Sequence, residues 1–167
     1  MKPLFTGLPR MSLYVFDTSS IRVFSNYYPS TFPAFWENLE NCVNEGRILS
    51  VREAYRELEL QSTKPHVDEW ANNNRHIFLV PTEQEMLFVA RLFQIPHFLQ
   101  LVSDKAIALG RPVADPFVIA SAHERGGSVV TEERNIANAG KIPNVCARFG
   151  VDCINVETLM EREGWSF

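Results

Sequence analysis

Acidic residues stand at four positions that follow a predicted strand or belong to a predicted helix. They are Asp17 after LYVF, Glu57 within VREAYREL, Asp115 at the start of DPFVIASA, and Glu133 after SVVTE. Taken singly, each has an ordinary explanation as a helix cap or a solvated surface charge. Gathered at one place, two carboxylates about 4 Å apart would repel each other by roughly 4 kcal/mol at an effective dielectric constant near 20. Such a cluster is tolerable only when it is protonated or neutralised by cations, so a divalent metal site is the chemistry to test.

Asp17 occupies the most informative of these positions. The residues before it, 13–16, form a continuous apolar run of β-formers, which predicts a strand buried on both faces. In an open α/β sheet, ligands bind beyond the carboxyl ends of the strands. We therefore expect Asp17 to face that crevice, and the same residue would also suit the start of the next helix as its cap.

Periodicity does not single out Glu57 among its neighbours. Glu59 lies at least as near the apolar face of the same predicted helix. Glu53 and Glu57 are four residues apart, where like charges repel by roughly a few tenths of a kcal/mol unless a positive charge lies near. This spacing is an indirect indication of a cation.

The elements that must position these acids alternate between helices and short apolar strands. Strands are predicted at 13–16, 48–50, 128–131 and 153–155. Helical spacing or capping signals mark 31–47, 51–62, 65–74, 82–95, 103–112, 114–127 and 144–151. The alternation predicts an α/β fold, a three-layer α/β/α sandwich with a central parallel sheet and right-handed crossovers.

Three of the predicted helices make specific predictions about the core. In 31–47, Gly46 stands where the helix should stop, and one helical face carries Phe35, Leu39, Cys42 and Val43. In 82–95, Thr82 and Glu85 form a capping-box pattern, and the expected core residues are Met86, Val89, Ala90 and Phe93. The helix at 114–127 is almost entirely apolar over 117–122, so we expect it at the centre of the fold.

Length and composition bound the class of protein. A chain of 167 residues can form one domain without disulfides, and we assign 11–167 to that domain and 1–10 to a short N-terminal extension. Prolines and a glycine interrupt any signal-peptide core, and no stretch approaches the roughly 18 apolar residues that span a bilayer. The 3 cysteines lack CxxC spacing and the 4 histidines are scattered, which argues against a disulfide scaffold and a zinc site. These features predict a cytoplasmic protein with no membrane association.

The motifs YVFDTSS, VREAYREL, ADPFVIASA and VVTEE, in this order, resemble those of the PIN-domain nucleases. The resemblance covers residues 13–156, and it is greatest to the bacterial toxin–antitoxin (VapC-like) kind. It implies a PIN-like fold in which a strand-ending Asp, a helix Glu, a helix-opening Asp and an acid after a strand-ending Thr gather at one end of the sheet.

Carried over to this chain, the resemblance implies that Asp17, Glu57 and Asp115 are catalytic acids that bind a metal. The fourth acid departs from the common pattern, because many relatives have Asp where this chain has Glu133. Glu133 keeps the carboxylate on a longer stem, and the neighbouring Glu132 is an alternative for the same role.

Hydroxyl side chains next to these acids are candidates for supporting roles. We expect Thr18 and Ser19 to orient Asp17 or a metal-bound water, and Thr131 to do the same for the last acid. Capping of the following helix is an equally compatible role for these hydroxyls.

An acid-only site suits Mg²⁺, or Mn²⁺, because both cations prefer oxygen ligands. One such ion, or two about 4 Å apart, can bind a phosphodiester, activate a water and stabilise the leaving oxygen. The expected activity is therefore metal-dependent cleavage of RNA by an endoribonuclease. Because the net charge is −4, phosphate contacts must come from local cations, for which the candidates are Arg22, Lys105, Arg111 and Arg134.

The resemblance also implies partners. Toxins of this family are held inactive by a small antitoxin protein that inserts a segment toward the acidic site, and they often form homodimers. An aromatic group could belong to such a surface, although core packing is the alternative for most of its members: Tyr27, Tyr28, Phe32, Phe35 and Trp36.

Two other functions fit parts of the pattern. A phosphotransfer enzyme of the aspartyl-phosphate type also uses an Asp after its first strand, but Ser19 stands where its second Asp is expected. A non-catalytic PIN-like module that binds RNA or protein is favoured by the Glu at the fourth position. The retention of all four carboxylates argues against that module.

Overall fold

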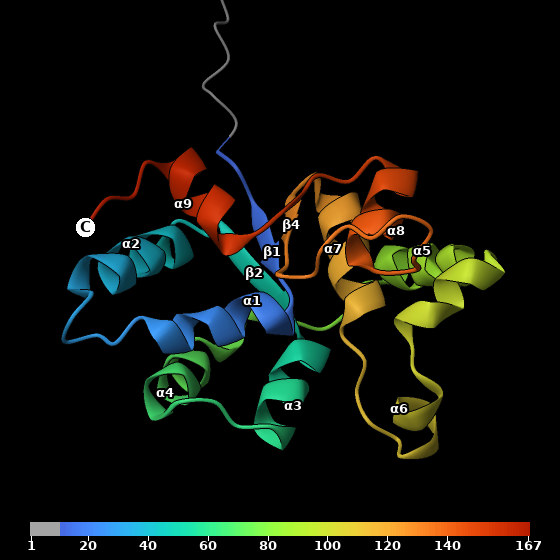
Figure 1. Ribbon diagram of the computed structural model, residues 1–167, viewed down its shortest axis with the longest axis horizontal. Helices are drawn as coiled ribbons and strands as arrows, with labels where there is room; N and C mark the ends of the chain where they lie inside the picture. The colour runs from blue at the N-terminus through green and yellow to red at the C-terminus, as the bar shows by residue number, and fades with distance from the viewer. Residues whose placement is uncertain (1–10) are drawn as a thin grey trace, which may run out of the picture.

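A central parallel sheet organises the molecule. The computed structural model describes residues 11–167 except the side chain of Lys105, and the predicted extension at 1–10 lies outside the described residues. The five strands lie in the order β3-β2-β1-β4-β5 and comprise β1 (Tyr14–Phe16), β2 (Ile48–Val51), β3 (Phe78–Leu79), β4 (Ser128–Val130) and β5 (Cys153–Ile154). Helices cover both faces of the sheet, which confirms the predicted three-layer α/β/α sandwich (Figure 1).

One face of the sheet is covered by α7 (Asp115–Arg125), which contacts β1, β2 and β4. The helices α5 (Glu83–Phe93) and α8 (Ile142–Phe149) pack against α7. All residues of α7 from Val118 to Ala122 are buried, as its apolar sequence predicts, and the left-handed Gly126 ends the helix. The predicted position of this helix at the centre of the fold is therefore confirmed.

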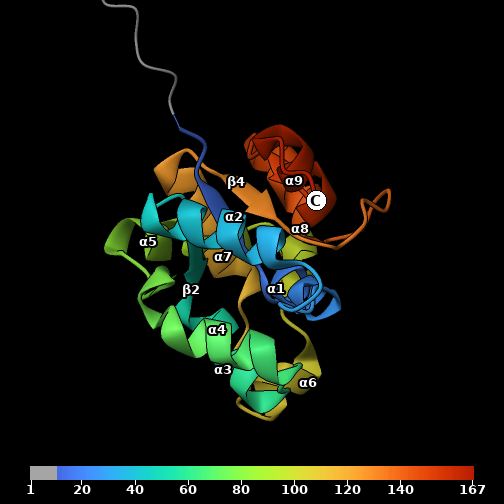
Figure 2. The ribbon, with the colours of Figure 1, turned by 90° about the vertical axis from the view of Figure 1, so that its left-hand side faces the viewer.

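The opposite face carries α2 (Pro33–Asn44) and α9 (Val156–Glu163), with α1 (Thr18–Val23), the 3₁₀ turn η1 (Phe24–Asn26) and α4 (Pro65–Asn73) beside them (Figure 2). Side chains alternate along a strand, so Phe16 points to this face, where its ring lies 5.6 Å from that of Phe24. The four predicted core residues of α2 are all buried, and Gly46 follows the helix with a φ of +72°. A strand side chain and the apolar stripe of α2 thus build this half of the core.

The predicted aromatic surface is largely part of that core. Phe35 is fully buried, and the ring of Tyr27 stacks on it at 4.2 Å. Tyr27, Phe32 and Trp36 are partly buried against the core, whereas Tyr28 is exposed. Core packing, the alternative for this group, is therefore the outcome for most of its members.

Two details of the prediction were wrong. The capping box of Thr82 and Glu85 is present, but the buried face of α5 comprises Glu85, Phe88, Val89 and Leu92. Met86 and Ala90 face solvent, because α7 lies against the neighbouring stripe of the helix. Strand β3 was not predicted, and its two residues, Phe78 and Leu79, come directly after the short turn η2 (Arg75–Ile77).

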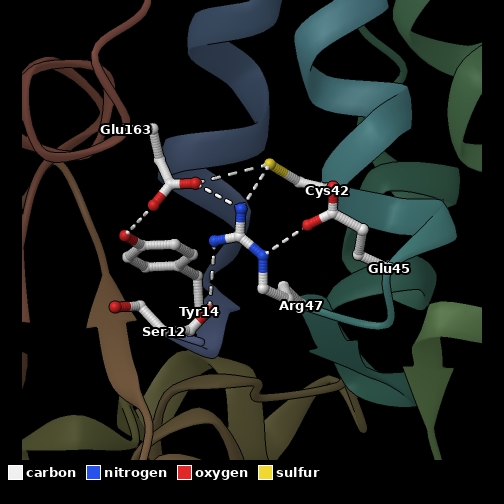
Figure 3. A network of polar contacts seen from close by, with 6 residues as sticks. All are labelled: Ser12, Tyr14, Cys42, Glu45, Arg47 and Glu163. Atoms are coloured by element: carbon white, nitrogen blue, oxygen red, sulfur yellow. Dashed lines mark hydrogen bonds and ion pairs between the residues drawn. The ribbon is translucent and has the colours of Figure 1, made fainter. Parts of the chain in front are cut away.

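A polar network fastens the amino edge of the sheet (Figure 3). Glu163 of α9 accepts hydrogen bonds from the Tyr14 hydroxyl at 2.8 Å and from the Arg47 guanidinium. Arg47 also donates to Glu45 at 2.8 Å and to the Cys42 sulfur at 3.4 Å. The network joins the last helix to the turn between α2 and β2.

The carboxyl edge of the sheet lies at the other end of the strands. There α1 follows β1 and α3 (Arg52–Leu60) follows β2, so that both helices start at the same edge. The turn η3 (Pro96–Leu101) and the short helix α6 (Asp104–Ala108) lead back to the start of α7 beside this edge. Among the described residues, no helix has the length and apolarity needed to cross a membrane.

Candidate active site

Four predicted acids line one cavity at the carboxyl edge of the sheet. The cavity has a volume of about 500 Å³, and its walls include Asp17, Glu57, Asp115 and Glu133. These residues come from the end of β1, from α3, from the start of α7 and from the loop after β4. Because parallel strands end at a common edge, the fold brings together side chains that are up to 116 positions apart in the sequence (133 minus 17).

Asp17 is held by a dense set of donors. Asp17 is 2% exposed, and its carboxylate accepts the Ser20 N–H at 2.8 Å as the cap of α1. The hydroxyls of Ser19 and Thr131 also donate to it, at 2.8 Å and 2.5 Å. Burial raises the pKa of Asp17 above its usual value, and these donors lower it in part. Asp17 therefore has both of the roles that the sequence suggested, as a helix cap and as a wall of the cavity.

Glu57 joins three elements. Its carboxylate accepts a hydrogen bond from the Thr18 hydroxyl and another from the backbone N–H of Ala114 at 3.1 Å. Burial raises the pKa of Glu57, and the nearby charge of Asp17 raises it further, whereas Arg22 lowers it. Neither Glu53 nor Glu59 lines the cavity, so the tertiary structure settles the choice that periodicity left open.

Asp115 faces the other three acids. Burial raises its pKa well above the usual value, and the charges of Glu133, Asp17 and Glu57 act in the same direction. Within the described part of the chain, no donor forms a hydrogen bond to its carboxylate. The negative charge of Asp115 is thus the least compensated of the four.

The two acids after β4 point to different places. Glu133 lines the cavity, and its Oε2 accepts the N–H of Ile142 at the start of α8 at 3.0 Å. Burial raises the pKa of Glu133, and the Ile142 N–H lowers it in part. Glu132 instead accepts the N–H of Val156 at the start of α9 at 2.9 Å and does not line the cavity. Glu133, not Glu132, is therefore the fourth acid of the cavity.

The supporting hydroxyls are arranged differently from the prediction. Ser19 contacts Asp17 as expected, but Thr18 donates to Glu57 instead of Asp17. The Thr131 hydroxyl donates to Asp17. It also accepts a hydrogen bond from the backbone N–H of Glu133 at 3.1 Å, and it does not contact the Glu133 carboxylate. The turns at the ends of β1 and β4 set these directions, which the sequence does not specify.

The predicted cations divide into two groups. Arg22 and Arg111 line the cavity, and one guanidinium nitrogen of Arg22 donates to the carbonyl of Gln61 at 2.9 Å. Arg134 is exposed and lies outside the cavity wall, and the side chain of Lys105 is outside the described part of the structure. The wall is completed by residues that the sequence analysis did not find and that carry no sequence signal of their own: Leu60, Gln61, Ala106 and Pro112.

The ligand set suits a hard divalent cation, since the side-chain ligands that the cavity offers are all oxygens: carboxylates, hydroxyls and the amide of Gln61. The uncompensated Asp115 also fits a cation chemically. Among residues 11–167, however, no three Asp, Glu, His or Cys side chains lie close enough together to hold one ion. The carboxylates therefore share a cavity without forming a preassembled coordination shell.

A family model described as "Domain of unknown function (DUF4411)" matches residues 14–167. A comparison with curated proteins finds no match. Among solved structures, the crystal structure of PAE2754 from Pyrobaculum aerophilum is similar, with 16% sequence identity and a TM-score of 0.47, covering 92% of this chain and 97% of that chain.

Proposed function

The chain belongs to the DUF4411 family, a family whose description states no activity. From the residues of the cavity we propose that the protein is a divalent-metal-dependent endoribonuclease, which hydrolyses RNA phosphodiester bonds. One observation carries the proposal. Four carboxylates from distant segments line one cavity, where burial raises the pKa of Asp115 and the charges of the other three acids raise it further. Such a group favours a cation as its partner. The resemblance of the motifs to PIN-domain nucleases supports the same activity.

The residues around the cavity have distinct roles in this proposal. The carboxylates of Asp17, Glu57, Asp115 and Glu133 would hold the cation. When bound, the divalent ion supplies positive charge and Lewis acidity at the phosphodiester. Ser19 and Thr131 fix the direction of the Asp17 carboxylate, and Thr18 fixes that of Glu57. Arg22 and Arg111 bind phosphate oxygens at the wall.

The substitution Asp17→Asn tests the activity. Asn keeps an oxygen that can cap α1, so the fold should persist, while the negative charge needed to hold the cation is lost. We expect RNA cleavage in Mn²⁺ to fall at least a hundredfold, measured on a labelled RNA. The control is Asp104→Asn, an exposed acid of α6 that does not line the cavity and should leave cleavage unchanged. Undiminished cleavage by Asp17→Asn would refute the proposal.

A non-catalytic module that binds RNA or protein is the second candidate. It is favoured by the separation of the carboxylates and by the hydrogen bonds that already engage Asp17, Glu57 and Glu133. Calorimetric titration with Mn²⁺ separates the two functions. The nuclease should bind Mn²⁺ in a way that Asp115→Asn abolishes, and an inert module should show no such acid-dependent binding.

The biological setting follows from the resemblance and is likewise a proposal. We propose a cytoplasmic toxin whose cavity is closed by a small antitoxin protein, with a homodimer as its assembly. Expression in bacteria should then arrest growth, and the Asp17→Asn variant should not. Equal growth of cells expressing either protein would remove the toxin assignment without affecting the nuclease activity measured in vitro.

A further inference from the structure

Two smaller cavities adjoin the acid-lined cavity and share wall residues with it. The first, which we call the Lys64 cavity, has a volume of about 310 Å³ and is lined by Arg22, Ser25, Thr63 and Lys64. The second, the Arg56 cavity, has a volume of about 380 Å³ and is lined by Arg56, Glu59, Leu60, Gly110, Arg111 and Pro112. Arg22 also belongs to the acid-lined cavity, and so do Leu60, Arg111 and Pro112. The three cavities are therefore neighbours, and we call them together the track.

The sign of the charge alternates along this track. Arg22 and Lys64 stand at one end, four carboxylates line the middle, and Arg56 and Arg111 stand at the other end. The Lys64 cavity is lined by α1, η1 and the loop before α4, and the Arg56 cavity by α3 and the segment after α6. The loop before α4 and the segment after α6 lie on opposite sides of α3 in Figure 1. A ligand that fills the track must offer negative charge at both ends. Its middle must carry a group that can bind the cation held by the four carboxylates.

The Lys64 cavity has the donors of an anion site. Two cationic side chains and the hydroxyl-bearing Ser25 and Thr63 face one small space. Arg22 is anchored by its bond to the Gln61 carbonyl, and the Lys64 ammonium lies 5.6 Å from the centre of the Tyr28 ring. The Thr63 hydroxyl donates to Asp68 at 2.9 Å, so one carboxylate stands behind this wall. Two cations still exceed that single negative charge.

The Arg56 cavity is less positive than the Lys64 cavity. Arg56 and Arg111 are both exposed, and Glu59 shares the wall with them. The apolar side chains of Leu60 and Pro112 lie between this cavity and the acids. Leu60 is 62% exposed, which offers a sugar or base an apolar surface next to the phosphate-binding cations.

We propose that the Lys64 and Arg56 cavities bind the phosphates on either side of the phosphodiester that the acids hold. This inference rests on the proposed function and extends it with residues not assigned to it above, Lys64, Ser25, Thr63 and Arg56. A nucleic-acid strand carries one negative charge per nucleotide, which matches cations at both ends of a track with a metal-dependent centre. Cleavage then occurs inside a strand, since both flanking phosphates are bound.

Binding of a short fluorescent single-stranded RNA, measured by anisotropy at several salt concentrations, tests the track. The parent protein is the full chain with Asp17→Asn and with EDTA present, so that the RNA is not cut. Lys64→Gln and Arg56→Gln each remove one end cation from an exposed side chain, where loss of the fold is not expected. The matched control is Arg148→Gln, because Arg148 is exposed and lines none of the three cavities.

Each end variant should bind the RNA about fivefold more weakly near 0.1 M salt and lower the slope of log K against log salt by about 0.7. Arg148→Gln should stay within about twofold of the parent. If Lys64→Gln and Arg56→Gln bind the RNA as Arg148→Gln does, the two end cavities do not bind phosphates and the inference is refuted. RNA cleavage by the wild-type protein would then show that the proposed nuclease function still stands. If the parent binds no RNA and the wild-type protein cleaves none, both proposals fall.

Discussion

At the scale of single residues, the four acids of the cavity differ in how their charge is balanced. Asp17 receives hydrogen bonds from two hydroxyls and a backbone N–H, Glu57 from a hydroxyl and a backbone N–H, and Glu133 from one backbone N–H. Asp115 receives none from the described residues, and burial and the other acids raise its pKa. Without a cation, the Asp115 carboxylate is therefore a source of instability near neutral pH.

Asp115→Asn should stabilise the metal-free protein. The change removes the repulsion from the other acids and keeps the size of the side chain, so we expect a gain on the order of 1 kcal/mol, or roughly 2–4 °C in Tm for a chain of this length. Thermal unfolding in EDTA at pH 7 measures the shift. The same variant should lose the stabilisation that Mn²⁺ gives the wild-type protein.

The exposed acid Asp104 again serves as the control, since Asp104→Asn removes a charge that does not line the cavity. Its Tm in EDTA should match that of the wild-type protein. A lower Tm for Asp115→Asn than for Asp104→Asn would show that the Asp115 carboxylate contributes favourable interactions without a cation.

At the scale of elements, the two edges of the sheet are held by different interactions. At the carboxyl edge, Glu57 links α1 to the start of α7 through Thr18 and Ala114, so the elements that form the cavity also support each other. At the amino edge, Arg47 and Glu163 form a largely buried ion pair that joins α9 to the turn before β2 (Figure 3). The interactions at the amino edge stabilise the fold, and none of their residues lines the cavity.

Arg47→Met should destabilise the fold by roughly 2–4 kcal/mol, because it leaves the Glu163 carboxylate buried without its cation. Urea unfolding at pH 7 measures this cost. The double variant Arg47→Met with Glu163→Gln should recover part of the loss, since the unpaired charge is then removed as well.

The exposed pair of Arg162 and Asp152 is the matched comparison. Both partners are more than 40% exposed, so Arg162→Met should cost less than about 1 kcal/mol. Equal losses for Arg47→Met and Arg162→Met would contradict the importance assigned to burial. RNA cleavage by folded Arg47→Met should equal that of the wild-type protein, since the network lies at the opposite edge from the cavity.

At the scale of the whole molecule, the cavity sets the pH dependence of stability. Burial raises the pKa values of Asp17, Glu57 and Asp115, so the folded protein retains protons that the unfolded chain has already lost. Stability falls with rising pH wherever the folded state binds more protons. We therefore expect the metal-free protein to lose stability as the pH rises from the ordinary carboxyl range, about 4 to 4.5, towards neutrality.

Urea unfolding in EDTA across this pH range measures the trend. Asp115→Asn should reduce the decline, because one of the groups with a raised pKa is gone, and saturating Mn²⁺ should reduce it in the wild-type protein. Asp152 acts in the opposite sense, since its bond to Arg162 lowers its pKa and its contribution is lost only as the pH falls below about 4. A stability that rises steadily from pH 5 to pH 7 without metal would contradict this account.

Much of the molecule could be predicted from the sequence because it depends on neighbours along the chain. The apolar run before Asp17, the capping box of Thr82 and Glu85, and the stop at Gly46 are local signals, and each appears in the structure as predicted. The alternation of helices and strands is likewise local, and it was sufficient for the fold class. Strand β3 is the exception, since its two residues follow the turn η2 without a break, whereas the equally short β5 was predicted.

Only the tertiary structure decided the contacts between distant segments of the chain. The sequence put Glu57, Glu53 and Glu59 on one helix and left Glu132 beside Glu133, and packing chose which carboxylates line the cavity. Packing also turned Thr18 toward Glu57, exposed Met86 on α5, and placed Arg22, Lys64 and Arg56 in the walls of the two cavities next to the acids. The physical reason is that propensities and caps act over a few residues, whereas the direction of a side chain depends on the surface that another element presents to it.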